Sequence, residues 1–370
     1  MYIAKMDNQL IEANFAVAEN KYFCPGCKCT VMLKRGVIKA PHFAHLSGAR
    51  CETFSEGETN EHLQGKIQLR DFFAAEYEVQ LEATLPAISQ RPDLLVKKPN
   101  GKLLAIEYQC SAISLAKLRQ RTAGYRQQGI QVLWILGSTY VNRKMTNPTL
   151  AKFMTVPLHG QPFVLFWENT HRRFCLWGNI AQPDFQKREK NITYATNLTE
   201  YRELMVAIYQ KQETVTIGTS LRLKAALKLQ QLVSQNRGFT KYLQQVAYQQ
   251  HCHLGGVTWL AHPKVQLPIG LKMPHSLWRA KFLLELQKYR PGERIANAQL
   301  LNKLLQPSDW YPDGQSSLLP TKQLIVRNFW QALIQQNIIE PISATHIRLN
   351  RHPVWYPDYQ LKIAGLKKSE

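Results

Sequence analysis

The chain has 370 residues, a formal net charge of +21 and an apolar fraction of 45%. This composition excludes a disordered or collagen-like protein and is sufficient for two or three packed domains. Lys and Arg are spread along the chain, and so large an excess favours a polyanionic partner, with nucleic acid ahead of an anionic membrane surface. Because no run of 18 apolar residues and no signal-peptide pattern is present, we expect a cytoplasmic protein without a membrane span.

Cysteine and histidine residues cluster in the first 56 residues. Cys24 and Cys27 form a Cys-x-x-Cys knuckle, and His45 and Cys51 follow a predicted hairpin around Gly36. This spacing is typical of zinc ribbons, in which four ligands hold a structural ion and leave no open position. A segment of this length builds only a small core, so bound Zn²⁺ would contribute on the order of 10 kcal/mol to its folding.

Two alternatives remain open for this segment. His42 could replace His45 as the third ligand, and Cys29 is expected to be a bystander. The segment could also be a metal-free strand pair with incidental cysteines in a reducing compartment. We predict a zinc-ribbon-like domain over residues 1–56.

Residues 58–73 have the apolar spacing of a helix, with Thr59 or Asn60 as its N-cap. Glu61 near its start could supply a carboxylate to a metal ion, or could simply be a first-turn acid favoured by the helix dipole. His62 and Lys66 are four residues apart and share a helix face, so both could contact a DNA phosphate.

The next feature is a β-hairpin around Asn100-Gly101, between two apolar runs. A two-residue turn would put Asp93 and Glu107 on opposite faces of the hairpin. A three-residue loop over 99–101 would put Asp93 directly opposite Glu107, with Gln109 on the same face. We prefer the three-residue loop because its proline fits a loop better than a strand.

Two acids held side by side repel each other unless a cation or a proton joins them. Mg²⁺ or Mn²⁺ is the hard cation that suits carboxylates, usually with substrate phosphates as further ligands. We therefore predict that Asp93 and Glu107 bind Mg²⁺ or Mn²⁺ with help from Glu61. The alternative is that both acids are solvated strand ends.

A basic helix over 115–126 and a continuous apolar strand over 131–137 follow the hairpin. With a closing strand pair over 163–177, residues 57–182 predict an α/β/α sandwich around a mixed sheet. Arg119, Arg121 and Arg126 on the basic helix could contact the DNA backbone or be solvated charges.

The rest of the chain, 183–370, predicts a mainly helical domain after a polar linker at 187–191. Helical patterns cover 198–212, 220–234, 240–251, 276–289, 296–305 and 322–336, with a small β element near 347–349 and 355–356. Phe329 and Trp330 are expected in the core, and His251-Cys252-His253 in local polar packing. Six basic residues could form a DNA-facing strip or solvated helix faces: Arg279, Lys281, Lys288, Arg290, Arg294 and Lys303.

Several motifs occur in a fixed order: Cys-Pro-x-Cys, His-Phe-Ala-His, Glu-His-Leu-x-Gly-Lys, Arg-Pro-Asp, Ile-Glu-x-Gln-Cys-Ser and Trp-Ile-Leu-Gly. Together they resemble the competence protein CoiA family over roughly residues 20–140. The resemblance implies a restriction-endonuclease-like core of the PD-(D/E)xK type, with Asp93, Glu107 and Gln109 in the core motif and Glu61 on the preceding helix. It also implies a role in transformation and recombination of incoming DNA, with single-stranded or branched DNA as partner and recombination proteins as further candidates.

Gln109 stands where lysine is commoner in such cores. Glutamine can hydrogen-bond an attacking water but brings no positive charge to a phosphate. The sequence therefore supports two hypotheses: a metal-dependent deoxyribonuclease, and a non-catalytic DNA-binding recombination accessory that uses the same cleft.

Overall fold

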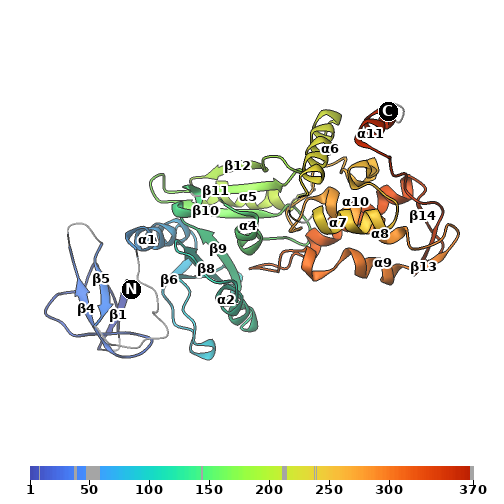
Figure 1. Ribbon diagram of the computed structural model, residues 1–370. Coiled ribbons are helices and arrows are strands. Elements are labelled where there is room, and N and C mark those ends of the chain that lie inside the picture. The colour runs from blue at the N-terminus through green and yellow to red at the C-terminus, as the bar shows by residue number, and fades with distance from the viewer. Residues whose placement is uncertain are drawn as a thin grey trace.

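The computed structural model describes residues 1–7, 9–36, 40–46, 59–142, 145–210, 215–236, 238 and 240–366. Figure 1 shows three parts in a row: a small N-terminal sheet, a larger mixed sheet with helices, and a mainly helical C-terminal part. This is the mixed α/β architecture that the sequence predicts. Across the described residues, no helix is both long enough and apolar enough to cross a membrane.

The N-terminal sheet is antiparallel, with strand order β2-β1-β3-β4-β5. Its strands are β1 (Ile3–Met6), β2 (Gln9–Glu12), β3 (Tyr22–Phe23), β4 (Thr30–Lys34) and β5 (His42–His45). Tyr22 and Phe43 pack with ring centroids 4.8 Å apart in its small core. The predicted second arm of the hairpin at 37–39 lies outside the described residues, and β4 pairs with β5.

The central sheet has seven strands in the order β12-β11-β10-β9-β8-β7-β6. Strands β8, β9 and β10 run parallel, and the other pairs are antiparallel, which confirms the predicted mixed sheet. The strands are β6 (Glu78–Leu81), β7 (Leu94–Lys97), β8 (Leu103–Gln109), β9 (Gln131–Leu136), β10 (Phe163–Glu168), β11 (Arg173–Ala181) and β12 (Glu189–Ala195). The helices are α1 (Asn60–Ala74), α2 (Leu115–Gln127), α3 (Ser138–Asn142), α4 (Asn147–Phe153) and α5 (Leu198–Tyr209).

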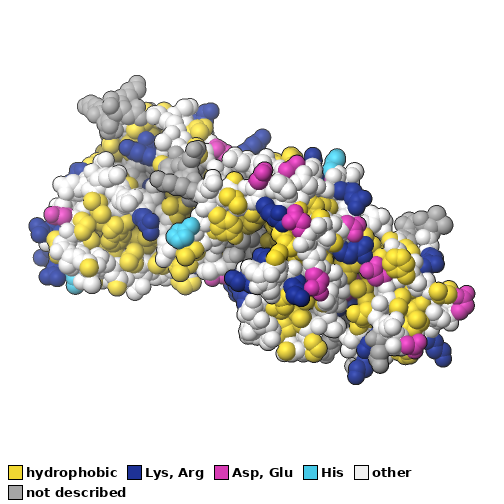
Figure 2. Space-filling view, turned by 180° about the vertical axis from the view of Figure 1, so that it is seen from behind, with side chains coloured by type: hydrophobic (Ala, Val, Ile, Leu, Met, Phe, Trp, Pro, Cys, Tyr) yellow, Lys and Arg dark blue, Asp and Glu magenta, His cyan; other side chains and the backbone are white. Residues whose placement is uncertain are grey.

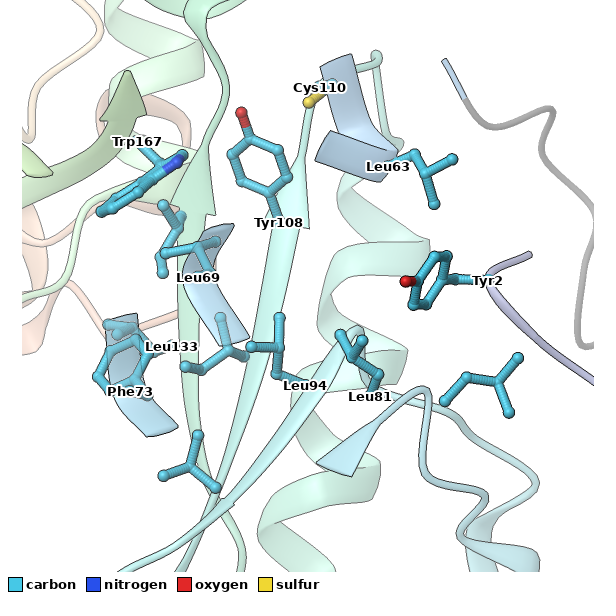
Figure 3. Close-up of a cluster of buried hydrophobic side chains, with 14 of the residues drawn as sticks. Tyr2, Leu63, Leu69, Phe73, Leu81, Leu94, Tyr108, Cys110, Leu133 and Trp167 are labelled. Carbon is cyan, nitrogen blue, oxygen red and sulfur yellow. The ribbon is translucent and has the colours of Figure 1, made fainter. Parts of the chain in front are cut away.

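Helices cover both faces of this sheet. On one face, Leu69 and Phe73 of α1 pack with Leu94, Tyr108 and neighbouring strand residues (Figure 3). On the other face, α2 and α4 cover a separate set of buried side chains from β8, β9 and β10. Because side chains alternate along a strand, β8 turns Tyr108 toward α1 and Glu107 toward α2.

The expected linker at 187–191 is wrong. Residues 189–191 belong to β12, which pairs with β11 at the edge of the sheet, and 187–188 directly precede this strand. The outer edge of such a strand is open to water, so a charged sequence is compatible with pairing on its inner side. Lys190 and Arg173 lie over the rings of Trp177 and Tyr194, respectively.

The C-terminal part contains five of the six helices predicted for 183–370 and one more, while the sixth, predicted over 198–212, is α5. The helices of the C-terminal part are α6 (Thr219–Ser234), α7 (Thr240–Gln249), α8 (His275–Leu286), α9 (Asn297–Leu304), α10 (Leu319–Gln335) and the unpredicted α11 (Tyr359–Leu366). A short sheet of β13 (Arg294–Ala296), β15 (His346–Leu349) and β14 (Ile339–Pro341) completes it, whereas residues 355–356 form no strand.

Phe329 is fully buried in the C-terminal core, as predicted. Arg279 is also buried, so it does not belong to an exposed DNA-facing strip. Lys281 pairs with Asp309. Figure 2 shows Lys and Arg dispersed over the visible face rather than gathered in one patch.

Candidate active site and metal centre

The turn of the β7–β8 hairpin has the predicted three-residue loop. The Gly101 N–H donates to the Lys98 carbonyl (2.9 Å), and the Lys98 N–H donates to the Lys102 carbonyl (2.9 Å). Gly101 has a φ of +76°, a left-handed conformation that glycine adopts without steric cost. The Asn100 side chain accepts from the Lys102 N–H and closes the loop.

This loop sets the register of the two strands. Leu94, the first residue of β7, lies opposite Ile106, and Asp93 directly precedes this strand. The Asp93 carboxylate accepts the backbone N–H of Tyr108 (2.8 Å), beside Glu107 on β8. The predicted register of the hairpin is confirmed up to Leu94, whereas the pairing of Asp93 with Glu107 on one face of the sheet stays a prediction.

Asp93 is held in its charged form by groups on α1 and β8. Its Oδ2 lies 3.3 Å from His62 Nε2, and its Oδ1 lies 4.0 Å from Lys66 Nζ. Burial acts to raise the pKa of Asp93, but His62, Lys66 and the Tyr108 N–H outweigh it and lower the pKa to about 2. The carboxylate is therefore ionised at neutral pH.

Glu107 is buried on the α2 side of the sheet. Its Oε1 accepts from Nε (3.0 Å) and Nη2 (2.5 Å) of Arg121 and from the Tyr125 hydroxyl. Burial raises the pKa of Glu107, Arg121 opposes this effect, and the negative charge of Asp93 adds to it. The charge of Asp93 therefore affects the pKa of Glu107, although the two carboxylates have hydrogen-bond partners on helices at opposite faces of the sheet.

A buried ion pair lies behind Asp93. Lys66 is fully buried, with its Nζ 2.5 Å from Glu82 Oε1. Glu82 also pairs with Arg91 (3.2 Å) and accepts the backbone N–H of Tyr2 (3.1 Å). Lys66 is therefore not exposed to a phosphate, contrary to the expectation, and has a structural role. Through Glu82 and Tyr2, the same network connects the N-terminal segment to the site.

Glu61, the predicted third acid, has its own set of partners. It accepts from Ser138 Oγ (2.6 Å) and from Thr139 Oγ1 (3.0 Å) at the turn between β9 and α3. These hydrogen bonds lower the pKa of Glu61 against the opposing effect of burial. Its role as a metal ligand stays a prediction.

Gln109 follows Glu107 by two residues on the same strand. Its Nε2 donates to the carbonyl (2.9 Å) and the hydroxyl (3.1 Å) of Ser111. The amide group is thus held by the loop that follows β8. Its role in positioning water stays a prediction.

The three arginines of α2 make protein contacts in this structure. Arg121 bonds Glu107, whereas Arg119 Nε donates to the Asp313 carbonyl (2.8 Å) and Arg126 Nη2 to the Gln315 carbonyl (2.6 Å). Two of them therefore hold a segment of the C-terminal part against α2. Their contact with DNA, and that of His62, stays a prediction.

Cys24, Cys27 and His45 form a separate candidate metal centre. Their ligand atoms all lie within 4.8 Å of one another, and Cys27 Sγ is 3.3 Å from His45 Nε2. Cys24 Sγ accepts the N–H groups of Gly26 (3.3 Å) and Cys27 (3.4 Å), which favours a thiolate. Within the described residues, this is the one group of three or more His, Cys, Asp and Glu side chains that could hold a metal ion.

The predicted fourth ligand, the alternative histidine and the expected bystander cysteine have different outcomes. Cys51 lies outside the described residues. Cys29 is exposed, and His42 Nδ1 lies 2.9 Å from the Ala40 carbonyl. His45 rather than His42 therefore joins the two knuckle cysteines.

Two family models match the chain. "Competence protein CoiA, N-terminal domain" matches residues 5–54, and "Competence protein CoiA, nuclease-like domain" matches residues 58–212. Together they cover more than half of the sequence. The chain belongs to the competence protein CoiA family. The nuclease-like CoiA domain extends beyond the predicted boundary at 182 and includes β12 and α5.

Competence protein CoiA of Bacillus subtilis (strain 168) is 35% identical to this chain over 133 residues. The match covers 36% of this chain and 35% of that protein, so it spans about a third of the length of this curated CoiA relative. No solved structure matches the chain.

Two residues of the CoiA nuclease-like site were not predicted from the sequence. Tyr125 lies four residues after Arg121 on α2, so helical spacing could have placed both beside Glu107. Glu82 directly follows β6, has a φ of +53° and belongs to none of the sequence motifs. Only the packing of β1 and α1 around it brings Tyr2, Lys66 and Arg91 together.

Proposed function

We propose that this chain is a metal-dependent deoxyribonuclease that acts on incoming DNA during natural transformation and its recombination. The observation that carries the proposal is the pair Asp93, just before β7, and Glu107 on β8 of a nuclease-like domain, which lie close enough for the charge of Asp93 to raise the pKa of Glu107. A divalent cation bound between two such carboxylates would relieve their mutual repulsion.

The donor set fits Mg²⁺ or Mn²⁺. Asp93 is ionised, and all three donors to Glu107 bind its Oε1, so Oε2 accepts no hydrogen bond from the described residues. Carboxylate oxygens are the ligands that these hard cations prefer. When bound, the ion would supply an activated water and charge stabilisation at the phosphate.

The residues of the chain have distinct parts in this proposal. His62 and Lys66 keep Asp93 ionised, and Arg121 and Tyr125 fix the orientation of Glu107. Gln109 would hydrogen-bond the attacking water through its carboxamide. The net charge of +21 would favour approach of a DNA strand.

We further propose that Cys24, Cys27, His45 and Cys51 bind a structural Zn²⁺. Two thiolates and one imidazole within ligand distance of one another suit a tetrahedral zinc site that takes one more ligand. Elemental analysis of the purified protein should give about one zinc per chain, and Cys27→Ser should lose it. A zinc content near zero in the native protein would refute this assignment.

The nuclease proposal is tested by cleavage assays. Single-stranded, duplex, forked and branched DNA are incubated with the protein and Mg²⁺, Mn²⁺ or EDTA. We expect metal-dependent cleavage that is lost in Asp93→Asn and Glu107→Gln while DNA binding is kept. Glu78→Gln, an exposed acid on β6, is the matched control and should cleave normally.

One observation favours a second function, a non-catalytic DNA-binding accessory in recombination. The neutral Gln109 bonds Ser111, and the nearby Lys66 is used by Glu82. A site without a mobile positive charge could hold DNA without cutting it. DNA binding with no cleavage on any substrate or metal would select this function.

A further inference from the structure

A groove of about 260 Å³ lies where the nuclease-like domain meets the C-terminal part. The nuclease-like domain contributes Pro162 and the end of β11, and the C-terminal part contributes residues 265–268 and helix α10. Its volume is just below the roughly 300–1,000 Å³ of sites for drug-sized ligands, and such sites are frequent at domain boundaries. The groove is separate from the site around Asp93 and Glu107 and suits a small ligand.

Helix α10 contributes four side chains to the lining. They follow the spacing i, i+3, i+4 and i+7 and so share one helix face: Leu324, Arg327, Asn328 and Gln331. Arg327 and Gln331 are exposed, and their side chains have no hydrogen-bond or ion-pair partner among the described residues. None of the described residues that line the groove is acidic, so the guanidinium of Arg327 is available to an anionic ligand.

An irregularity in β11 places a carboxamide at the groove. The pairing of β11 with β12 shifts register between Gly178 and Ala181, and Asn179 between them has a φ of +53°. This left-handed conformation is uncommon for residues other than glycine, and asparagine is among those that tolerate it. Strand irregularities of this kind redirect a side chain and are frequent beside functional sites. The Asn179 carboxamide lines the groove and has no hydrogen-bond partner among the described residues.

The orientation of two further carboxamides follows from their partners. Arg279 can only donate, and its Nη2 lies 2.8 Å from Asn328 Oδ1, so Asn328 Nδ2 remains as a donor. The Gln266 amide nitrogen donates to the carboxylate of Glu189, which leaves its Oε1 as an acceptor. The lining therefore combines a fixed donor, a fixed acceptor and unpaired carboxamides with one cation.

This combination discriminates among small ligands. A cationic ligand would meet an arginine and no acid. An inorganic anion would use Arg327 alone and would leave the carboxamides unpaired. A ligand with one negative charge and a flat edge of donors and acceptors uses both kinds of group, and nucleotides have this chemistry.

We propose that this groove binds one nucleotide through its base and its phosphate. Carboxamides pair with donors and acceptors on the edge of a base, and the guanidinium of Arg327 suits the phosphate. Apolar side chains of the lining can pack against the flat face of the base: Pro162, Val215, Val265, Pro268 and Leu324. A free nucleotide and a nucleotide within a single strand share this chemistry.

The test is calorimetric titration of the full chain in buffer without Mg²⁺ or Mn²⁺, so that strand cleavage does not interfere. The probes are a deoxynucleoside 5′-monophosphate of each base, the same deoxynucleosides without phosphate, and inorganic phosphate. A short single strand and an abasic strand of the same length complete the set. Because no cleavage is measured, failure of the nuclease proposal leaves this test unaffected.

Two variants remove groups from the groove. Arg327→Gln removes the cation from an exposed position. Asn179→Gly removes a carboxamide, and glycine adopts the left-handed backbone without steric cost. Arg348→Gln removes an exposed arginine on β15, outside the groove, and is the matched control.

We expect one mononucleotide to bind per chain. Arg327→Gln should weaken binding of the monophosphates at least about tenfold because a charge-assisted bond is lost, and should change deoxynucleoside binding far less. Asn179→Gly should weaken binding of both, and Arg348→Gln should bind like the native protein. If Asn179→Gly does not fold, Arg327→Gln carries the same test.

The strand probes distinguish the two sources of the nucleotide. Tighter binding of the single strand than of the abasic strand, lost in the groove variants, assigns the groove to a nucleotide within a strand. Mononucleotide binding without this preference assigns it to a free nucleotide.

The proposal is overturned if the native protein shows no saturable binding of the mononucleotides or of the single strand. Equal affinity in the native protein and the folded groove variants would also overturn it. Inorganic phosphate that binds as tightly as the monophosphates would show that the base is not recognised, with the same consequence.

Discussion

Two buried clusters of charged residues differ in their balance. Near the hairpin, the acids Glu82, Asp93 and Glu107 form ion pairs with Lys66, Arg91 and Arg121. In the C-terminal half, Arg222, Arg279 and Lys362 are buried, and the buried carboxylate of Asp184 accepts the backbone N–H groups of His275 and Ser276. The first cluster holds its acids through side-chain cations, whereas the acid of the second is held by backbone N–H groups and Lys362 contacts a neutral imidazole.

This difference predicts that replacing a buried lysine destabilises the first cluster more than the second. Lys66→Met leaves Glu82 buried without its closest cation, so we expect a loss of about 3–5 kcal/mol in the free energy of unfolding. Urea unfolding of the full chain measures it. Lys97→Met breaks the exposed pair with Glu78 and should cost no more than about 1 kcal/mol. Equal effects of the two substitutions would contradict the structural role of Lys66.

Tyr125→Phe tests the matched cluster on the α2 side. The variant removes a hydrogen bond to the buried Glu107 carboxylate while keeping the ring, so we expect a loss of about 1.5–3 kcal/mol. The pKa of Glu107 should rise further because its charged form loses a donor. Unfolding as a function of pH measures both, and a pKa unchanged by the variant would show that Tyr125 does not hold the carboxylate.

Asp93 makes the stability of the protein depend on pH in the acidic range. Its pKa is lower in the folded protein than in the unfolded chain, so its contribution to stability is present above the ordinary Asp pKa and is lost as pH falls toward about 2. The contribution is about 2 kcal/mol at neutral pH. In unfolding measurements, the difference between the native protein and Asp93→Asn should therefore shrink between about pH 5 and pH 2. A difference that grows toward low pH has the wrong sign for this account.

Among the substitutions of buried residues, Lys362→Met should have the smallest effect on the free energy of unfolding. Lys362 bonds a neutral imidazole rather than an acid, so its removal leaves no buried carboxylate uncompensated. We expect its free energy of unfolding to lie within about 1 kcal/mol of that of the native protein. A loss as large as that of Lys66→Met would mean that the second cluster contains an acid partner for Lys362.

The sequence predicted those features that depend on local chemistry. The loop 99–101 determines which residues of β7 and β8 face each other, so the register from Leu94 to Lys97 followed from the turn. Ligand spacing likewise predicted the meeting of Cys24, Cys27 and His45.

Features that depend on distant packing were missed. The stretch at 187–191 looks like a linker because an edge strand tolerates charge, and only its pairing with β11 shows otherwise. Lys66 looks like a surface lysine until Glu82 and the N-terminal strand enclose it. Lys362 lies on a helix that the sequence did not predict, and its partner His262 is 100 residues away.

The most direct test of the central claim is Mn²⁺ binding by the zinc-saturated protein, followed by electron paramagnetic resonance. If Asp93 and Glu107 hold a divalent cation, the native protein and Glu78→Gln bind one Mn²⁺ alike, and Glu107→Gln binds it at least about tenfold more weakly. Mn²⁺ binding of equal strength in Glu107→Gln, or none in the native protein, would contradict the account.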